Sequence, residues 1–81
     1  MMGLPGLKFL LYKNGLSAKD LESVTGKSTR TIQEYIKGDT NPPLPILIKV
    51  ADHFDVSIDY LVGRKEYYTE DGKIETNNND V

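Results

Sequence analysis

The residues with the clearest chemical potential form one polar face of a short helix. Ile32, Tyr35 and Ile36 fall on the opposite, apolar face of the same segment. The outward positions hold Thr29, Arg30, Gln33, Glu34 and Lys37. A helix start that offers hydroxyl, guanidinium and amide groups suits a groove lined with base edges. An alternative to base contact stays open, in which Arg30 and Glu34, four residues apart, form an ion pair with each other on the solvated surface.

Other arrangements typical of catalysis or metal binding are missing from the sequence. It contains no cysteine and one histidine, His53, which has no second ligand at a suitable spacing. There is no glycine-rich phosphate loop after a strand and no Ser/His/Asp set in a strand-turn-helix context. We therefore expect no enzyme activity, no metal, no cofactor and no small-molecule substrate.

The length of 81 residues predicts one small domain, which buries roughly 60% of the surface of its unfolded chain. The lack of cysteine favours a reducing compartment. No apolar run approaches the ~20 residues that span a bilayer, and the first residues do not resemble a signal peptide. These features predict a cytoplasmic protein with no membrane partner.

Apolar spacing and capping residues predict a compact all-α bundle of five helices, with no strand before residue 65. The expected helices run from Leu4 to Tyr12, from Ser17 to Gly26, from Ser28 to Gly38, from Leu44 to Phe54 and from Ser57 to Gly63. In the second helix, Ser17 and Asp20 are spaced as a capping box, and Leu16 is placed to pack on Leu21.

Inward faces follow from the same spacing. For the fourth helix the predicted stripe is Leu44, Leu47, Ile48, Ala51 and Phe54, which leaves Ile46 and Val50 off the stripe. Three tyrosines, Tyr12, Tyr35 and Tyr60, fall on the inward stripes and are expected to be core or rim aromatics rather than stacking platforms for single strands.

The second and third helices, separated by a tight turn around Gly26, form a helix-turn-helix. From residue 7 to residue 64 the chain resembles the phage repressor/Cro-like helix-turn-helix domains of bacterial transcriptional regulators. The resemblance rests on Leu16-Ser17 with Leu21, Thr25-Gly26-Lys27-Ser28, Thr31-Ile32, Tyr35-Ile36-Lys37-Gly38, Asn41-Pro42 with Leu44, Leu47-Ile48-Lys49-Val50-Ala51-Asp52 and Phe54-Asp55-Val56-Ser57-Ile58-Asp59-Tyr60-Leu61-Val62-Gly63.

By this resemblance, the helix opened by Ser28 enters the major groove of double-stranded DNA, and Thr29, Arg30 and Glu34 take base-facing positions. Arg30 would bind guanine, Thr29 would offer its methyl group to thymine, and Glu34 would accept from a cytosine amino group. Phosphate contacts are expected on both sides of that helix, from Ser17, Ala18, Lys19, Lys27, Gln33, Lys37, Thr40 and Asn41.

Three residues depart from the family pattern. Ala18 replaces a glutamine that many members use to bind a phosphate and to brace the recognition helix. Glu22 stands where the family favours alanine, so its longer side chain must bend outward or reach a partner such as Arg30. Lys27 replaces an aliphatic residue in the turn.

Charge is distributed unevenly along the chain. Residues 1–65, the expected DNA-binding domain, carry nine Lys and Arg against seven Asp and Glu, whereas residues 66–81 carry one Lys against five acids. The whole chain therefore has a net charge of -2 only because of its tail. An Asp-Gly pair between β-favouring runs makes this tail either a short hairpin or a disordered segment.

Domains of this kind read few base pairs, so we expect a homodimer that binds two half-sites. The predicted dimer patch consists of Tyr60, Val62, Tyr67 and Tyr68. The leading hypothesis is a sequence-specific regulator of transcription, in particular a repressor, that associates with the nucleoid by binding DNA. The alternative is a protein-interaction module, such as an antitoxin-like partner, which the missing glutamine and the weak basic charge favour.

Overall fold

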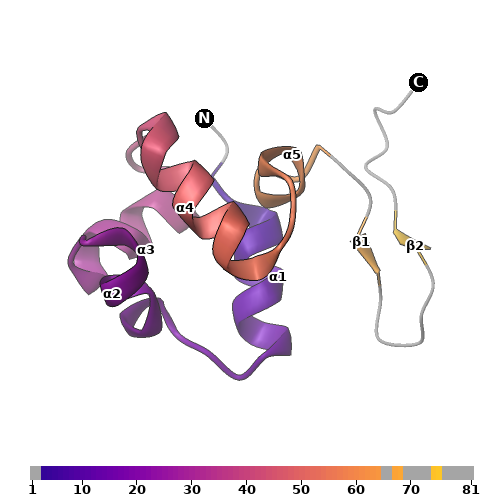
Figure 1. The fold of residues 1–81 in the computed structure, drawn as a ribbon, viewed down its shortest axis with the longest axis horizontal. Helices are drawn as coiled ribbons and strands as arrows, with labels where there is room; N and C mark the ends of the chain where they lie inside the picture. The colour runs from indigo at the N-terminus through magenta and orange to yellow at the C-terminus, as the bar shows by residue number, and fades with distance from the viewer. Residues whose placement is uncertain (1–2, 65–66, 69–73, 76–81) are drawn as a thin grey trace.

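The computed structural model describes residues 3–64, 67–68 and 74–75 (Figure 1). Its helices are α1 (Pro5–Lys13), the 3-10 helix η1 (Ala18–Leu21), α2 (Glu22–Thr25), α3 (Thr29–Lys37), α4 (Leu44–Phe54) and α5 (Ile58–Leu61). Five α-helices thus form the body, which confirms the all-α prediction. None of the described helices is both long and apolar enough to cross a membrane.

The core lies where the helices converge beneath α4, which crosses the middle of the body in Figure 1. Its most completely buried side chains are Leu7, Leu21, Ile32 and Leu61, from α1, η1, α3 and α5. Burial of such side chains contributes about 1.5–3 kcal/mol each. The core therefore joins the helix-turn-helix to the first and last helices of the bundle.

Gly6 allows α1 and α5 to pack with their backbones in close contact. A Cβ atom on Gly6 would lie 2.7 Å from the carbonyl carbon of Tyr60 and 3.0 Å from the Cα atom of Leu61, and closer still to the carbonyl oxygen of Tyr60. Only glycine fits this position, because the atoms that a side chain would meet belong to the backbone.

The turn between α2 and α3 is held by local hydrogen bonds. Gly26 has a φ of 73°, in the left-handed region that glycine adopts without strain. The Ser28 hydroxyl caps α3 by accepting from the Thr31 amide at 3.2 Å. The buried Thr25 hydroxyl donates to the Leu21 carbonyl at 2.8 Å and accepts from the Lys27 amide at 3.1 Å. The orientation of α3 against α2 is therefore fixed at its first turn.

The predicted second helix begins as a 3-10 helix and continues as the short α2. The predicted bond from the Ser17 amide to the Asp20 carboxylate is present at 2.7 Å, so the helix start was located correctly. A 3-10 turn is a common form for a helix end, and capping residues alone do not distinguish the two kinds of turn.

The predicted inward face of α4 is correct at Ala51, which is buried, and at Leu47 and Phe54, which pack against the core, but it is wrong at the other positions. Ile46 and Val50 are buried, whereas Leu44 is 59% and Ile48 is 43% exposed. This segment is apolar at most positions, so its spacing is compatible with two stripes. Packing against α2 on one side and α5 on the other selects the stripe that includes Ile46, Val50 and Ala51.

The three tyrosines differ in their surroundings. Tyr35 is buried and Tyr60 is half-buried, but Tyr12, at 75% exposed, lies on the surface, so its predicted inward position is wrong. Leu10 and Leu11 in the same last turn of α1 enter the core, and the next residue, Tyr12, lies on the opposite, solvent-facing side of the helix.

Two short strands follow the helices. The strand β1 (Tyr67–Tyr68) pairs antiparallel with β2 (Ile74–Glu75), with Tyr67 opposite Glu75 and Tyr68 opposite Ile74. Of the two alternatives for the tail, this pairing corresponds to the hairpin; its predicted Asp-Gly turn and the last residues, 76–81, lie outside the described residues.

Candidate nucleic-acid interface

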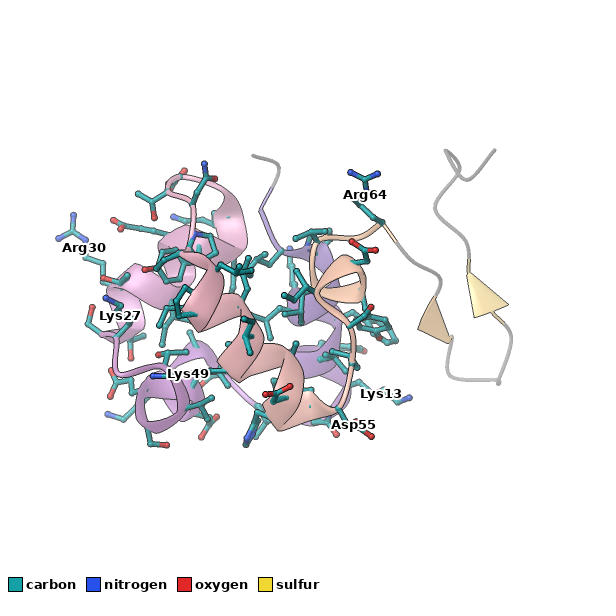
Figure 2. All side chains as sticks on the ribbon, turned by 45° about the horizontal axis from the view of Figure 1, so that its top comes forward. Lys13, Lys27, Arg30, Lys49, Asp55 and Arg64 are labelled. Atoms are coloured by element: carbon teal, nitrogen blue, oxygen red, sulfur yellow. The ribbon has the colours of Figure 1, made fainter. Side chains whose placement is uncertain are left out.

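The outer face of α3 carries the polar side chains expected to read DNA. Its inner face is closed, because Ile32 and Tyr35 are only 1% and 8% exposed. On the outer face, the Arg30 side chain is 90% exposed. Figure 2 shows Arg30 projecting from one end of the molecule, with Lys27 at the same end. A guanidinium in this position is accessible to a partner as large as a DNA duplex.

Arg30 and Glu34 form the ion pair that is the alternative to base contact, with 3.5 Å between Arg30 Nε and Glu34 Oε2. An exposed pair of this kind contributes about 0.2–1 kcal/mol, which a bidentate contact to guanine can replace. Because the Arg30 side chain is 90% exposed and the pair is weak, the pair is compatible with a base contact by Arg30.

The Glu22 carboxylate makes the contact that the sequence did not reveal. Its Oε2 atom accepts from the Thr29 amide at 2.9 Å and from the Thr29 hydroxyl at 2.5 Å. Of the two options for the long side chain of Glu22, it reaches a partner. That partner is Thr29, seven residues further along the chain, rather than Arg30. This contact ties α2 to the first residue of α3.

Both hydrogen bonds favour the ionised carboxylate. The Thr29 hydroxyl, followed by the Thr29 amide, lowers the pKa of Glu22 below its ordinary value, with a further contribution from the charge of Lys19. At neutral pH, Glu22 therefore places a negative charge at the N-terminus of α3, where the helix dipole also favours it.

This lowered pKa makes stability depend on pH in acid. We expect the wild-type protein to be more stable than Glu22→Gln above about pH 5. The difference should decline as the pH falls below the ordinary value of a glutamate and vanish below the lowered pKa of the folded protein. Thermal unfolding between pH 3 and pH 7 measures it.

The matched control is Thr29→Val, which removes the largest cause of the shift. In this background, the effect of Glu22→Gln should depend less on pH. Parallel stability curves for the wild-type protein and Glu22→Gln across the whole range would contradict the assignment.

At the edge of the interface before α2, donors expected to bind a phosphate are already bonded to a side chain of the protein. The Ser17 amide donates to Asp20 in the predicted capping box, and the Ser17 hydroxyl donates to the same oxygen at 3.3 Å. A phosphate would have to displace this carboxylate to reach the Ser17 amide. The Ala18 side chain is buried, whereas Lys19 is exposed.

The other edge lies in the loop after α3. Thr40, Asn41 and Lys37 are exposed there. Lys37 Nζ lies 3.7 Å from Asp39 Oδ2, in a pair that is exposed on both sides and therefore weak. Gln33 and Lys27 are also exposed. The predicted phosphate-binding residues apart from Ala18 are thus exposed, on α3 itself and in the segments before and after it, and Ser17 is already bonded to Asp20.

A family model for the helix-turn-helix matches residues 7–61. The chain belongs to the Cro/C1-type helix-turn-helix family. Among solved structures, a transcriptional regulator from Listeria innocua is 35% identical, with a TM-score of 0.67. That match covers 82% of this chain and 59% of the regulator, so this chain spans well under two thirds of the regulator's length. No curated protein matches the chain.

Membership of the Cro/C1-type family confirms the resemblance seen in the sequence, and the matched residues include α3, the second helix of the helix-turn-helix. The Glu22–Thr29 bonds link α2 to this helix from a position different from that of the family's bracing glutamine, which is Ala18 here. The bracing interaction is therefore present in this protein, but with a carboxylate as its acceptor.

The residues of the predicted dimer patch lie at and after α5. Tyr60 and Val62 are half-buried and pack against the core cluster. Tyr67 and Tyr68 belong to β1, and their side chains lie outside the described part of the chain. Within residues 3–64, 67–68 and 74–75, no three His, Cys, Asp or Glu side chains gather closely enough to hold a metal ion.

Proposed function

We propose that this Cro/C1-type protein is a sequence-specific DNA-binding regulator of transcription that acts as a repressor. It inserts α3 into the major groove, where Thr29, Arg30 and Glu34 contact bases. The phosphates on either side are contacted by the backbone at Ala18 and by Lys19, Lys27, Gln33, Lys37, Thr40 and Asn41. At Ser17 the phosphate displaces the Asp20 carboxylate from the backbone amide.

The observation that carries the proposal is the exposed Arg30 at the N-terminal end of α3, in a chain that matches the helix-turn-helix family over residues 7–61. Residues near the start of this helix reach base edges when it enters the groove. The similarity to a transcriptional regulator from Listeria innocua supports the same conclusion.

Selection of bound duplexes from a random pool, followed by titration at several salt concentrations, tests the proposal. A contact with several phosphates predicts a binding constant that falls steeply with salt, by about 0.9 logarithmic units per phosphate for each tenfold rise. Failure to bind any selected duplex in a salt-dependent manner would refute DNA binding.

A homodimer through Tyr60, Val62, Tyr67 and Tyr68 would place two recognition helices on half-sites about 34 Å apart. The selected duplexes should then contain an inverted repeat. Sedimentation at tens of micromolar should give a dimer, and Tyr60→Ser combined with Val62→Ser should shift it toward monomer. A wild-type protein that sediments only as a monomer would count against this patch.

Removal of residues 66–81 should strengthen binding to a duplex with a single half-site, which one subunit can occupy without the dimer patch that includes Tyr67 and Tyr68. This segment carries a net charge of -4, and without it the rest of the chain has a net charge of +2. We expect a gain on the order of tenfold in affinity at low salt, which shrinks as salt screens the charges. Titration of one duplex with the full and shortened chains measures this gain. Equal affinity at low salt would show that the tail has no electrostatic effect.

The alternative function is that of a protein-interaction module. The exposed Leu44 and Ile48, one turn apart on α4, favour it because exposed apolar neighbours often mark a protein-binding surface. Under this alternative, Leu44→Ser should abolish capture of a host protein, whereas Arg30→Ala should leave that capture intact. The reverse pattern, with only DNA binding affected, favours the regulator.

A further inference from the structure

Thr29 has no hydrogen-bond donor left for DNA. Its backbone amide and its hydroxyl proton both go to Glu22 Oε2, at 2.9 and 2.5 Å. A threonine has only these two donors, so the groups that remain are the lone pairs of the hydroxyl oxygen and the methyl group. The first residue of the recognition helix can therefore accept a hydrogen bond or make an apolar contact.

The bonds to Glu22 are strong enough to persist beside DNA. Hydrogen bonds to an ionised acceptor are roughly twice as strong as those between neutral groups. The branched side chain of Thr29 also has few rotamers to choose from at the start of a helix. Turning the hydroxyl toward a base would leave the carboxylate without one of its two partners.

We propose that Glu22 is a specificity-determining residue that acts through Thr29: by taking both donors of Thr29, it excludes guanine from the bases that Thr29 can bind. This inference rests on the proposed function, since it concerns the insertion of α3 into the major groove.

The donors and acceptors that each base presents in the major groove explain why Thr29 excludes guanine. Guanine presents only acceptors there, at N7 and O6, so a residue without donors gains nothing from it. Adenine and cytosine present amino groups that the Thr29 oxygen can accept from, and thymine presents a methyl group. Thr29 thus selects any of these three bases over guanine.

Arg30, the next residue, has the opposite character because a guanidinium only donates. Guanine is therefore recognised by Arg30 and rejected by Thr29. Thr29 offers only acceptors and the adjacent Arg30 only donors, so together they fix the position of α3 along the DNA. A shift that brings guanine to Thr29 loses a contact at both residues.

Selection from a random duplex pool tests the inference with the full chain. The base pair that faces Thr29 is the one whose preference changes in Thr29→Ala. At this pair, the wild-type protein should disfavour guanine. In Glu22→Ala the freed hydroxyl can donate to guanine, and the relative affinity for guanine there should rise by about fivefold, the value of one neutral hydrogen bond. Preferences at other pairs should not change.

Glu22→Gln is the conservative variant, because its amide oxygen can still accept from both Thr29 donors. It should retain the rejection of guanine even though it lacks the charge, whereas a purely electrostatic effect of Glu22 would make it behave as Glu22→Ala. Asp55→Asn is the matched control for the loss of one negative charge. Asp55 lies on the other side of the helical body from Arg30 in Figure 2, and asparagine tolerates its φ of 58°.

Thermal unfolding establishes that Glu22→Ala is folded, and Glu22→Met, which keeps the length of the side chain without an acceptor, replaces it if it is not. Unchanged preference at the Thr29 pair in these variants would overturn the inference while DNA binding stands. Absence of salt-dependent binding by the wild-type protein would instead overturn the proposed function itself.

Discussion

Gly6→Ala should lower the free energy of unfolding by about 3 kcal/mol or more. The added methyl group would meet the backbone of Tyr60 and Leu61, at 2.7 Å from the Tyr60 carbonyl carbon and 3.0 Å from the Leu61 Cα atom. Neither atom can move away as a flexible side chain would, so α1 and α5 must separate. A domain of 81 residues has a stability of about 4–12 kcal/mol, of which this is a large part.

Thermal or urea unfolding measures the effect, and the midpoint temperature should fall by roughly 10–25 °C. Lys8→Ala is the control on the same helix, because Lys8 is exposed and its replacement should change stability by less than about 0.5 kcal/mol. A Gly6→Ala protein as stable as Lys8→Ala would show that α1 and α5 do not pack with their backbones in contact.

The sequence allowed the helices and their order to be predicted because their ends are marked by local chemistry. Ser28 and Ser57 accept hydrogen bonds from amides three residues later, and Gly38 has a φ of 92° at the end of α3. Such signals depend on neighbours in the chain, which the sequence displays directly.

The buried face of a helix was less predictable where it depends on residues far away in the sequence. The inner face of α3 was correct because polar residues surround a single apolar stripe. In α4 eight of the eleven positions are apolar, and the buried set was fixed by contacts with α2 and α5. The hydrogen bonds from Thr29 to Glu22 were not predicted for a similar reason. They span the turn at Gly26, and predicting them requires knowledge of the angle between α2 and α3.

Glu22 also shows what the missing glutamine implies. The absence of this residue at Ala18 suggested a recognition helix without a brace. Glu22 supplies a brace from one turn further along the same helical segment, with a carboxylate that is ionised at neutral pH. A carboxylate accepts but never donates, so it anchors α3 without itself offering a donor to a phosphate.

Arg30→Ala should abolish the preference for one DNA sequence rather than DNA binding as such. The Arg30 side chain is 90% exposed and its pair with Glu34, at 3.5 Å from Nε, is weak, so the guanidinium can turn to guanine. A bidentate contact of this kind contributes about 1–3 kcal/mol of discrimination, which is about a 5- to 150-fold change in relative affinity. Titration of the selected duplex and of a duplex with this guanine replaced, at one salt concentration, measures the ratio.

Two further variants separate base reading from charge. Arg30→Lys keeps the charge but cannot form the two parallel hydrogen bonds, so it should retain affinity for the replaced duplex and lose most of the discrimination. Lys13→Ala removes one positive charge far from Arg30 in Figure 2 and should leave the ratio of affinities unchanged. If Arg30→Ala weakened binding to both duplexes equally, Arg30 would be a phosphate contact, and the reading of guanine would have to come from another residue on the outer face of α3.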